Sequence, residues 1–496
     1  ASIPFKKVLL FEDVTLHVDA ALHNVAMVSP VPPLAFTQGE AALTTDGRSL
    51  HVQARAKLGG EPATLTLDED VTTPGGQVKL DLASTAGPVL WRMLGLETAG
   101  GTAPFTLHVS GSADGAQTAR IAADLTPASL SAAAFGWAKG PGDAGSVSTT
   151  LALQNGAFMG VRALSAQAPG LNVKGAAQGQ TLVFTTIDIG RTQATGTLTP
   201  PTRPGAPWAA RFTGPVLDLR HDTSSTPAHS TVQQAEAAPS GPRWTAALDF
   251  TQLYLAAAPA PPLQDFSFTG EGQGGTPLSL QSQAQGLSLS IAPQSATRRT
   301  LALQAQDAGM LLRTLGAYEG MSGGTLALHA VYGDGLPATG TLTLQGARFV
   351  HAPGVTKFLQ SLTLYGVAEA ASGPGLLVDH ANMPFSLKDG VLYLKGARAF
   401  SASLGFTASG SVVLADDTCN LDATIVPAYA LNALPGKLPW FGHIFSAEKG
   451  GGLFAMRAHI SGSLNEPHVS INPLSALTPG FLRGIFGLNL DGAPKP

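Results

Sequence analysis

The chain has 496 residues and a formal net charge of −4, and 12% of its residues are charged, against about 25% in an average soluble domain. No basic cluster occurs, which argues against nucleic acid as a partner, because phosphate binding needs concentrated lysine and arginine. The single cysteine, Cys419, excludes an internal disulfide. The length suits two or three domains, or one elongated architecture.

Residues 1–7 (Ala-Ser-Ile-Pro-Phe-Lys-Lys) lack the apolar core of a signal peptide and read as a strand already inside a domain. No apolar stretch reaches about 18 residues, so the sequence predicts no membrane-spanning helix. We expect a targeting or anchor segment upstream of this chain.

Short strands of the form Gly-x-Leu-x-Leu recur along nearly the whole chain. Residues 340–346 (Gly-Thr-Leu-Thr-Leu-Gln-Gly) are the cleanest copy. Because successive side chains of a strand point to opposite faces, one face is leucine and the other is threonine, serine, alanine or glutamine. Strands of ordinary length would number about 30.

Two short helices interrupt the strands, and their sequences resemble each other. Pro88 suits the first helical position of one helix, which ends Arg-x-Leu-Gly before a Gly-Gly turn and a strand with His108. Asp307 can cap the start of the other helix, and the same order then leads to a strand with His329. This repetition predicts an internal duplication.

The second helix is expected to present one apolar face. Leu311, Leu315 and Tyr318 have the spacing i, i+4, i+7, and Gly316 is expected to end the helix in the left-handed conformation. Residues 355–364 form a third helix or a strand, since their period fits both.

The strongest break in the strand pattern is residues 221–243, which are rich in Ser, Thr, Pro and Gln and have no apolar period. We therefore divide the chain into an N-terminal β-segment at 1–220, a disordered loop or linker at 221–243, a C-terminal β-segment at 244–487 and a tail at 488–496.

Three matches to catalytic motifs are interpreted as coincidences. Residues 320–324 fit G-x-S-x-G, but a helix precedes the serine and a strand follows it. Residues 270–275 fit G-x-G-x-x-G, but a strand follows. Residues 446–449 fit S-x-x-K within a loop. The 12 histidines show no metal-ligand spacing, and the acidic runs 68–70 and 416–417 are placed in turns, so we expect no metal, no cofactor and no enzyme.

The pattern predicts a mostly β fold, in which a long, curled, mainly antiparallel sheet with a few short helices forms a trough with a leucine lining. Two or three stacked sandwiches would use the same alternation, because a sandwich core also buries leucine. The residues expected to line the groove are Leu65, Leu67, Phe105, Leu107, Val109, Leu287, Leu289, Ile291, Leu301, Leu303, Leu326, Leu328, Leu342, Leu344, Leu392 and Leu394.

Four segments follow one another in the last third. They are residues 307–318, residues 427–442 with Pro-Ala-Tyr-Ala-Leu-Asn and Leu-Pro-Trp-Phe-Gly, residues 451–467 with Gly-Gly-Leu-Phe-Ala and Ile-Ser-Gly-Ser-Leu-Asn-Glu-Pro, and residues 471–483. By these segments, residues 300–487 resemble the C-terminal region of the AsmA-like superfamily of Gram-negative envelope proteins, which includes the YhdP and TamB types.

The resemblance implies a U-shaped β-sheet with a hydrophobic groove that runs through the periplasm from an inner-membrane anchor. Members are similar to bridge-like lipid transfer proteins that move phospholipid toward the outer membrane. Implied partners are phospholipid or another lipid, the inner membrane through a missing N-terminal helix, and outer-membrane or envelope proteins. This chain departs from the pattern by lacking that transmembrane helix and by being shorter than the largest members.

We therefore expect lipid transport along a continuous hydrophobic groove. The alternative is a structural or scaffolding envelope protein, built of β-sandwich modules, that binds a membrane-protein partner. A short apolar helix carrying Phe481, Leu482, Ile485 and Phe486 is expected either to cap the end of the sheet or to contact a membrane or partner.

Overall fold

The computed structural model describes residues 17–28, 35–73, 75–96, 98–220, 241–257, 259–295, 297–333, 335–350, 376–401, 404–427, 456–464 and 467–472. The candidate helix at 355–364, the helix with Phe481, Leu482, Ile485 and Phe486, and the S-x-x-K match lie outside the described residues, as does most of the predicted linker.

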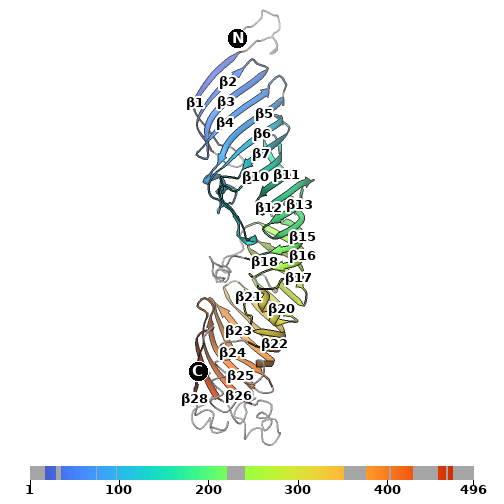
Figure 1. The fold of residues 1–496 in the computed structure, drawn as a ribbon. Helices are drawn as coiled ribbons and strands as arrows, with labels where there is room; N and C mark the ends of the chain where they lie inside the picture. Colours follow the sequence, from blue (N-terminus) through green and yellow to red (C-terminus); the bar gives the residue numbers. More distant parts are fainter. Residues whose placement is uncertain are drawn as a thin grey trace, which may run out of the picture. The chain divides into compact units, whose positions relative to one another are not determined.

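The chain divides into two compact units, residues 1–222 and 223–496. Among the described residues the main sheet contains 26 strands, of which β1–β7 and β10–β15 belong to the first unit and β16–β28 to the second (Figure 1). Strand β16 begins at Arg243, so the predicted linker at 221–243 extends one residue too far.

The strands of the first unit are β1 (Val18–Val28), β2 (Ala35–Thr45), β3 (Ser49–Leu58), β4 (Glu61–Asp70), β5 (Gln77–Ala86), β6 (Ala103–Ser112), β7 (Ala116–Asp124), β8 (Leu130–Ala132), β9 (Trp137–Lys139), β10 (Ser146–Gln154), β11 (Ala157–Ala168), β12 (Leu171–Gln178), β13 (Thr181–Ile189), β14 (Thr192–Thr199) and β15 (Trp208–Asp218).

The strands of the second unit are β16 (Arg243–Tyr254), β17 (Leu263–Gln273), β18 (Thr276–Ala284), β19 (Leu287–Pro293), β20 (Arg298–Ala305), β21 (Met321–Gly333), β22 (Leu336–Phe349), β23 (Leu376–Lys388), β24 (Val391–Phe400), β25 (Leu404–Val413), β26 (Thr418–Pro427), β27 (Met456–Ser463) and β28 (His468–Asn472).

Within each unit every strand of the main sheet pairs antiparallel with the next one along the chain. Strands β8 and β9 are not part of the main sheet, because they form a separate two-stranded hairpin. The next strand of the main sheet after β7 is therefore β10, with which β7 pairs. Among the described strands of either unit, the first and last do not pair with each other, so each unit contributes an open, curled sheet (Figure 1). The predicted fold class, mostly β and antiparallel with few helices, is confirmed.

Short aspartate turns close several strand ends. The Asp46 carboxylate accepts the backbone N–H groups of Ser49 at 2.8 Å and Arg48 at 2.9 Å, and these bonds lower its pKa to about 2. The hydroxyl and the amide of Thr72 donate to Asp70 in the same way and lower its pKa. Such turns reverse the chain without a longer loop, as antiparallel neighbours require.

The two acidic runs have different outcomes. Asp416 and Asp417 lie in the turn between β25 and β26, as predicted. The placement of residues 68–70 in a turn is wrong, because they form the end of β4, and the Asp68 side chain lies opposite His51 and Lys79 of the neighbouring strands. Cross-strand charge pairing lets the strand continue through this acidic run.

In the described part of the chain, two short α-helices connect adjacent strands. Helix α1 (Pro88–Met93) joins β5 to β6 and starts at Pro88 as predicted, and helix α3 (Ala308–Thr314) joins β20 to β21. Both helices are followed by a glycine with positive φ, Gly95 at 72° and Gly316 at 64°, as the sequence predicts for Gly316. The two repeated sequences therefore adopt the same strand–helix–strand arrangement.

Helix α3 is held to the sheet by Leu311, which is buried. The expectation that Leu315 shares this face is wrong, since its side chain is 47% exposed. The regular helix ends at Thr314, and Leu315 occupies the C-cap position, where the helical spacing no longer applies.

The start of α3 offers a test of its capping. The Asp307 carboxylate accepts the Met310 N–H at 2.8 Å. Replacing Asp307 with alanine is expected to destabilise the helix by about 1 kcal/mol, because the N–H loses its acceptor. Hydrogen exchange at the α3 amides should quicken about fivefold, and Asp307→Asn, which keeps an acceptor oxygen, should resemble the parent. Equal exchange in all three proteins would show that the cap contributes nothing.

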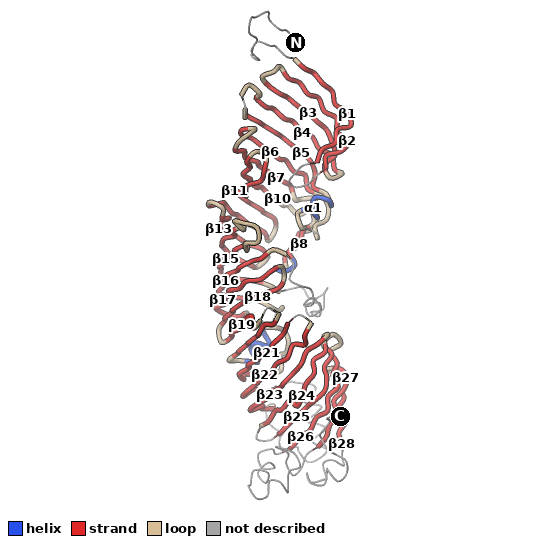
Figure 2. Tube along the Cα trace, turned by 180° about the vertical axis from the view of Figure 1, so that it is seen from behind, coloured by secondary structure: helices blue, strands red, loops and turns tan. Residues whose placement is uncertain are grey.

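Both helices pack on the same kind of surface, the apolar side of their sheet. Trp91 of α1 packs with Ala103 and Leu125, and its indole N–H donates to Gly101 O at 3.1 Å. Leu311 of α3 packs with Leu326 and Leu344. In Figure 2 α1 lies beside the strands of the first unit and α3 beside β21 in the second.

Candidate functional site

The strand register decides whether the leucines of different strands share a face. Directly paired residues of antiparallel strands place their side chains on the same side of the sheet. A slip of one residue at any pairing would send the leucines of the next strand to the other side. The pairings can therefore be followed strand by strand to find what each face carries.

In the second unit, three apolar rows cross the sheet. We call the side of the sheet that carries them the apolar face of the second unit. The rows are Leu289–Leu303–Leu328–Leu342–Met383, then Leu287–Ala305–Leu326–Leu344–Ala381–Ala399–Phe406–Ile425, and Ile291–Leu301–Ala330–Gly340–Phe385–Leu394–Gly410–Leu421–Ile460–Val469. Leu392 lies on the same side, opposite Leu387 and Val412.

The first unit has an equivalent surface, the apolar face of the first unit. Its two rows are Leu43–Val52–Leu67–Leu80–Val109–Ala119–Leu151–Val161 and Ala41–Ala54–Leu65–Leu82–Leu107–Ile121–Thr149–Leu164. Phe105 lies on this side as well, opposite Ser84 and Ala123. Every residue predicted to line the groove thus falls on the apolar face of its own unit.

Where strands are irregular, bulges keep the apolar side chains of neighbouring strands on the same side of the sheet. Between β23 and β24 the register shifts after Asn382, yet Phe385 still meets Leu394. The extra residue falls near Gly396, which has a φ of 65° that a side chain would strain. The bulge absorbs one residue, so the leucines of β24 return to the apolar face.

Most of the apolar rows are neither buried nor fully exposed. Among the predicted lining residues, Leu326 and Leu344 are buried, at 8% and 5% exposure, and the others are partly exposed. The two buried leucines belong to the cluster that Leu311 of α3 covers. A sandwich core would bury the rows throughout, so partial exposure favours an open surface that the helices cover only locally.

The opposite side of each sheet is polar. In the second unit Ser288, Gln304, Ala327, Thr343 and Asn382 form one row of it. A hollow of about 480 Å³ lies over β18–β22, and its lining includes glutamines and threonines of this side, Gln283, Gln304, Thr325, Thr343 and Gln345. The same lining includes Leu287, Ala305 and Leu326 of the apolar rows, so polar and apolar side chains both border this hollow.

Three histidine–aspartate pairs cross strands on the polar sides. The Nδ1–Oδ1 distances are 2.6 Å for His51–Asp68, 2.5 Å for His108–Asp81 and 3.0 Å for His459–Asp422. All six side chains are at least 39% exposed, a setting in which an ion pair contributes little. They form solvated cross-strand pairs.

The G-x-S-x-G match differs from the prediction that a strand follows the serine, because Ser322 already lies within β21, which begins after residues 315–320 have followed helix α3. The residues of G-x-G-x-x-G form the end of β17 and the β17–β18 turn, so a strand follows them as predicted. In the described part of the chain, no group of three or more His, Cys, Asp or Glu residues could hold a metal ion. No helix within that part is long and apolar enough to cross a membrane.

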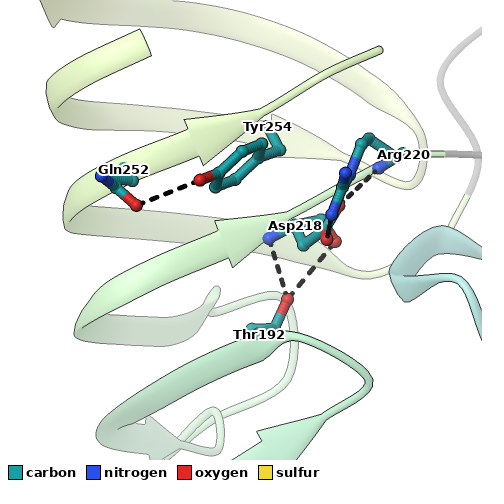
Figure 3. A network of polar contacts seen from close by, with 5 residues as sticks. All are labelled: Thr192, Asp218, Arg220, Gln252 and Tyr254. Carbon is teal, nitrogen blue, oxygen red and sulfur yellow. Dashed lines mark hydrogen bonds and ion pairs between the residues drawn. The ribbon is translucent and has the colours of Figure 1, made fainter. Parts of the chain in front are cut away.

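One buried ion pair lies at the end of β15. Asp218 is 5% exposed, and Arg220 Nε donates to its Oδ1 at 2.8 Å (Figure 3). Thr192 fixes the backbone there, because its Oγ1 accepts the Asp218 N–H at 2.9 Å and donates to the Asp218 carbonyl. The hydrogen bond from Arg220 holds the pKa of the Asp218 carboxyl below its usual value of 3.8.

This ion pair predicts a pH dependence of stability for the first unit. A carboxyl whose pKa is lower in the folded state stabilises that state above the unfolded pKa of about 3.9. The contribution is lost as the pH falls from there through the folded pKa. Between pH 6 and pH 2 the free energy of unfolding should therefore fall less steeply for Asp218→Asn than for the parent. At pH 6 the variant should already be less stable. Parallel pH profiles would contradict this.

Comparison with known protein families, curated proteins and solved structures finds no match for this chain.

Proposed function

We propose that the chain carries lipid, with acyl chains lying on the apolar faces and moving from strand to strand. The observation that carries this proposal is the continuity of the apolar rows, most of whose members stay partly exposed, although Leu82 and Ile425 are buried away from the helices. The expected setting is the periplasm of a Gram-negative cell, with an inner-membrane anchor upstream and phospholipid moving toward the outer membrane.

The energetics show why continuity matters. Exposing acyl chains to water costs about 0.8 kcal/mol per CH₂, so two 16-carbon tails cost roughly 25 kcal/mol. A row of leucines that extends without a gap keeps the tails out of water at every step. Similar contacts at each strand also give similar affinity, so a lipid is not held in one deep well.

The rows are longer than a single acyl tail, which is expected of a conduit and not of a pocket for one lipid. The row from Ile291 in β19 to Val469 in β28 crosses about 43 Å at about 4.8 Å per strand. Half of a bilayer's hydrocarbon core is about 15 Å thick, so one tail covers about three strands. The second unit therefore has several successive positions for a lipid.

Site-specific photo-crosslinking tests the proposal. A crosslinker at Leu342, on the apolar face, should capture lipid, and one at the adjacent Thr343, on the polar side, should capture none. Leu344 is less suitable, because it is buried beneath α3. Equal lipid capture at both positions, or capture of protein alone at Leu342, would argue against lipid on this face.

The second candidate is a scaffold that binds a membrane-protein partner. It would use the same apolar faces, but a protein surface rather than lipid would cover them. Crosslinks from Leu342 and Leu328 to one defined protein would favour this function, because both side chains belong to the same partly exposed row.

A further inference from the structure

One arginine lies among the leucines of the second unit. Strand β20 alternates regularly, so Arg299, Leu301 and Leu303 all point to the apolar face. Arg299 pairs with Pro293 on one side and Tyr332 on the other, one row outside Ile291 and Leu301. It therefore lies at the border of the apolar face, where the strands end.

Arg299 is 9% exposed. The guanidinium carries five N–H donors and a permanent charge, and burying it without acceptors is costly. Strands β18–β22 contain no aspartate or glutamate, and their other charged side chains are Arg298, His329 and Arg348. Among the described residues, no hydrogen bond or ion pair engages the Arg299 side chain.

Tyr332 pairs with Arg299, and the charge of Arg299 affects the pKa of the Tyr332 phenol. Burial raises the pKa of its phenol, and the Arg299 charge acts in the opposite direction. The phenol stays protonated at neutral pH, so its O–H can donate to an anion placed beside the guanidinium. The border of the apolar face thus offers a planar cation and a hydroxyl next to a leucine row.

We propose that Arg299 binds the phosphate of a lipid head group while the acyl chains lie on the rows that contain Leu301 and Leu303. The guanidinium suits this ligand, because its fork matches two phosphate oxygens and its charge needs an anion. The water-facing end of the lipid then meets the strand ends, and the tails meet the leucines. This inference rests on the proposed function and adds to it the residue that binds the phosphate of the lipid.

The test compares two lipids with identical acyl chains, phosphatidylglycerol and diacylglycerol, each offered in vesicles to the purified full chain. Bound lipid is counted by mass spectrometry. The parent should prefer phosphatidylglycerol, and Arg299→Gln should lower its capture roughly tenfold without changing diacylglycerol capture, tenfold being about 1.4 kcal/mol. Arg298→Gln removes a charge from the adjacent, polar-side position and should behave like the parent.

The outcomes separate the two claims. If the parent captures neither lipid, the proposed function fails. If it captures both equally, or if Arg299→Gln keeps the preference, only the role of Arg299 fails. Glycerophosphate should not displace phosphatidylglycerol at equal concentration, and displacement would assign the site to a free phosphate compound instead.

A stability measurement tests whether Arg299 serves only to stabilise the fold. Arg299→Leu should melt no lower than the parent when lipid is absent, because it removes a buried charge that no described residue neutralises. A lower melting temperature would overturn the inference. Asp334, in the β21–β22 connection and outside the described residues, supplies a further control, since Asp334→Asn should leave the lipid preference unchanged.

Discussion

Replacing Leu342 with aspartate is expected to block the passage of lipid along its row in the second unit and to weaken lipid binding at that position about 100-fold. Leu342 lies between Leu328 and Met383 in the middle of an apolar row and is partly exposed. A charged side chain in hydrocarbon costs about 2.5–3.5 kcal/mol, and the aspartate would interrupt the row where a tail must pass. The measurement is the yield of phosphatidylglycerol crosslinked from a photo-crosslinker at Leu328, the neighbour of Leu342 in its row, after incubation with vesicles.

The matched control is Thr343→Asp, which puts the same charge on the polar side one residue away and should leave capture unchanged. A second pair, Leu303→Asp and Gln304→Asp, repeats the comparison two strands away. Circular dichroism must show that all four variants keep their sheet. Loss of capture in both members of a pair, with the sheet intact, would mean that the face does not decide lipid binding.

Replacing Lys139 with methionine is expected to destabilise the β8–β9 hairpin by about 3 kcal/mol. Lys139 is 3% exposed, and its Nζ donates to the carbonyl oxygens of Leu125 at 2.8 Å, Ala128 at 2.9 Å and Gly140 at 3.0 Å. Methionine keeps the length of the side chain but leaves these oxygens without a donor, at about 1–3 kcal/mol for each that stays buried. Removing a buried charge offsets part of that cost.

Hydrogen exchange over residues 125–140 measures this loss locally, which suits a chain of two units that need not unfold together. The control is Lys174→Met, an exposed lysine of β12 whose loss should change stability by no more than about 0.5 kcal/mol. Exchange that is equally slow in Lys139→Met and in the parent would show that the ammonium does not hold the hairpin.

The alternation of the sequence predicted both the fold class and the side on which each leucine lies. Alternation is a property of single strands, so Leu342 and Thr343 could be assigned to opposite sides without knowing their neighbours. Helix ends were also readable, because Pro88 and Gly316 act through local backbone geometry. Leu315 was misplaced because a helical period was extended beyond the point at which the helix stops.

Whether the leucine faces would be covered could not be predicted, since coverage depends on contacts between elements distant in sequence. Leu326 and Leu344 are buried by such a contact, with Leu311 of α3. Arg299 was missed although a signal existed. Its position two residues before Leu301 places it on the leucine side, and a charge at that position is an exception to the pattern.

The most direct test of a lipid-carrying face is mass spectrometry of the lipids that remain with the gently purified chain. The account predicts diacyl phospholipid in amounts of at least one molecule per chain, reduced in Leu342→Asp and retained in Thr343→Asp. A chain that purifies free of lipid, and whose leucine rows crosslink only to protein, would contradict it and leave the scaffold as the function.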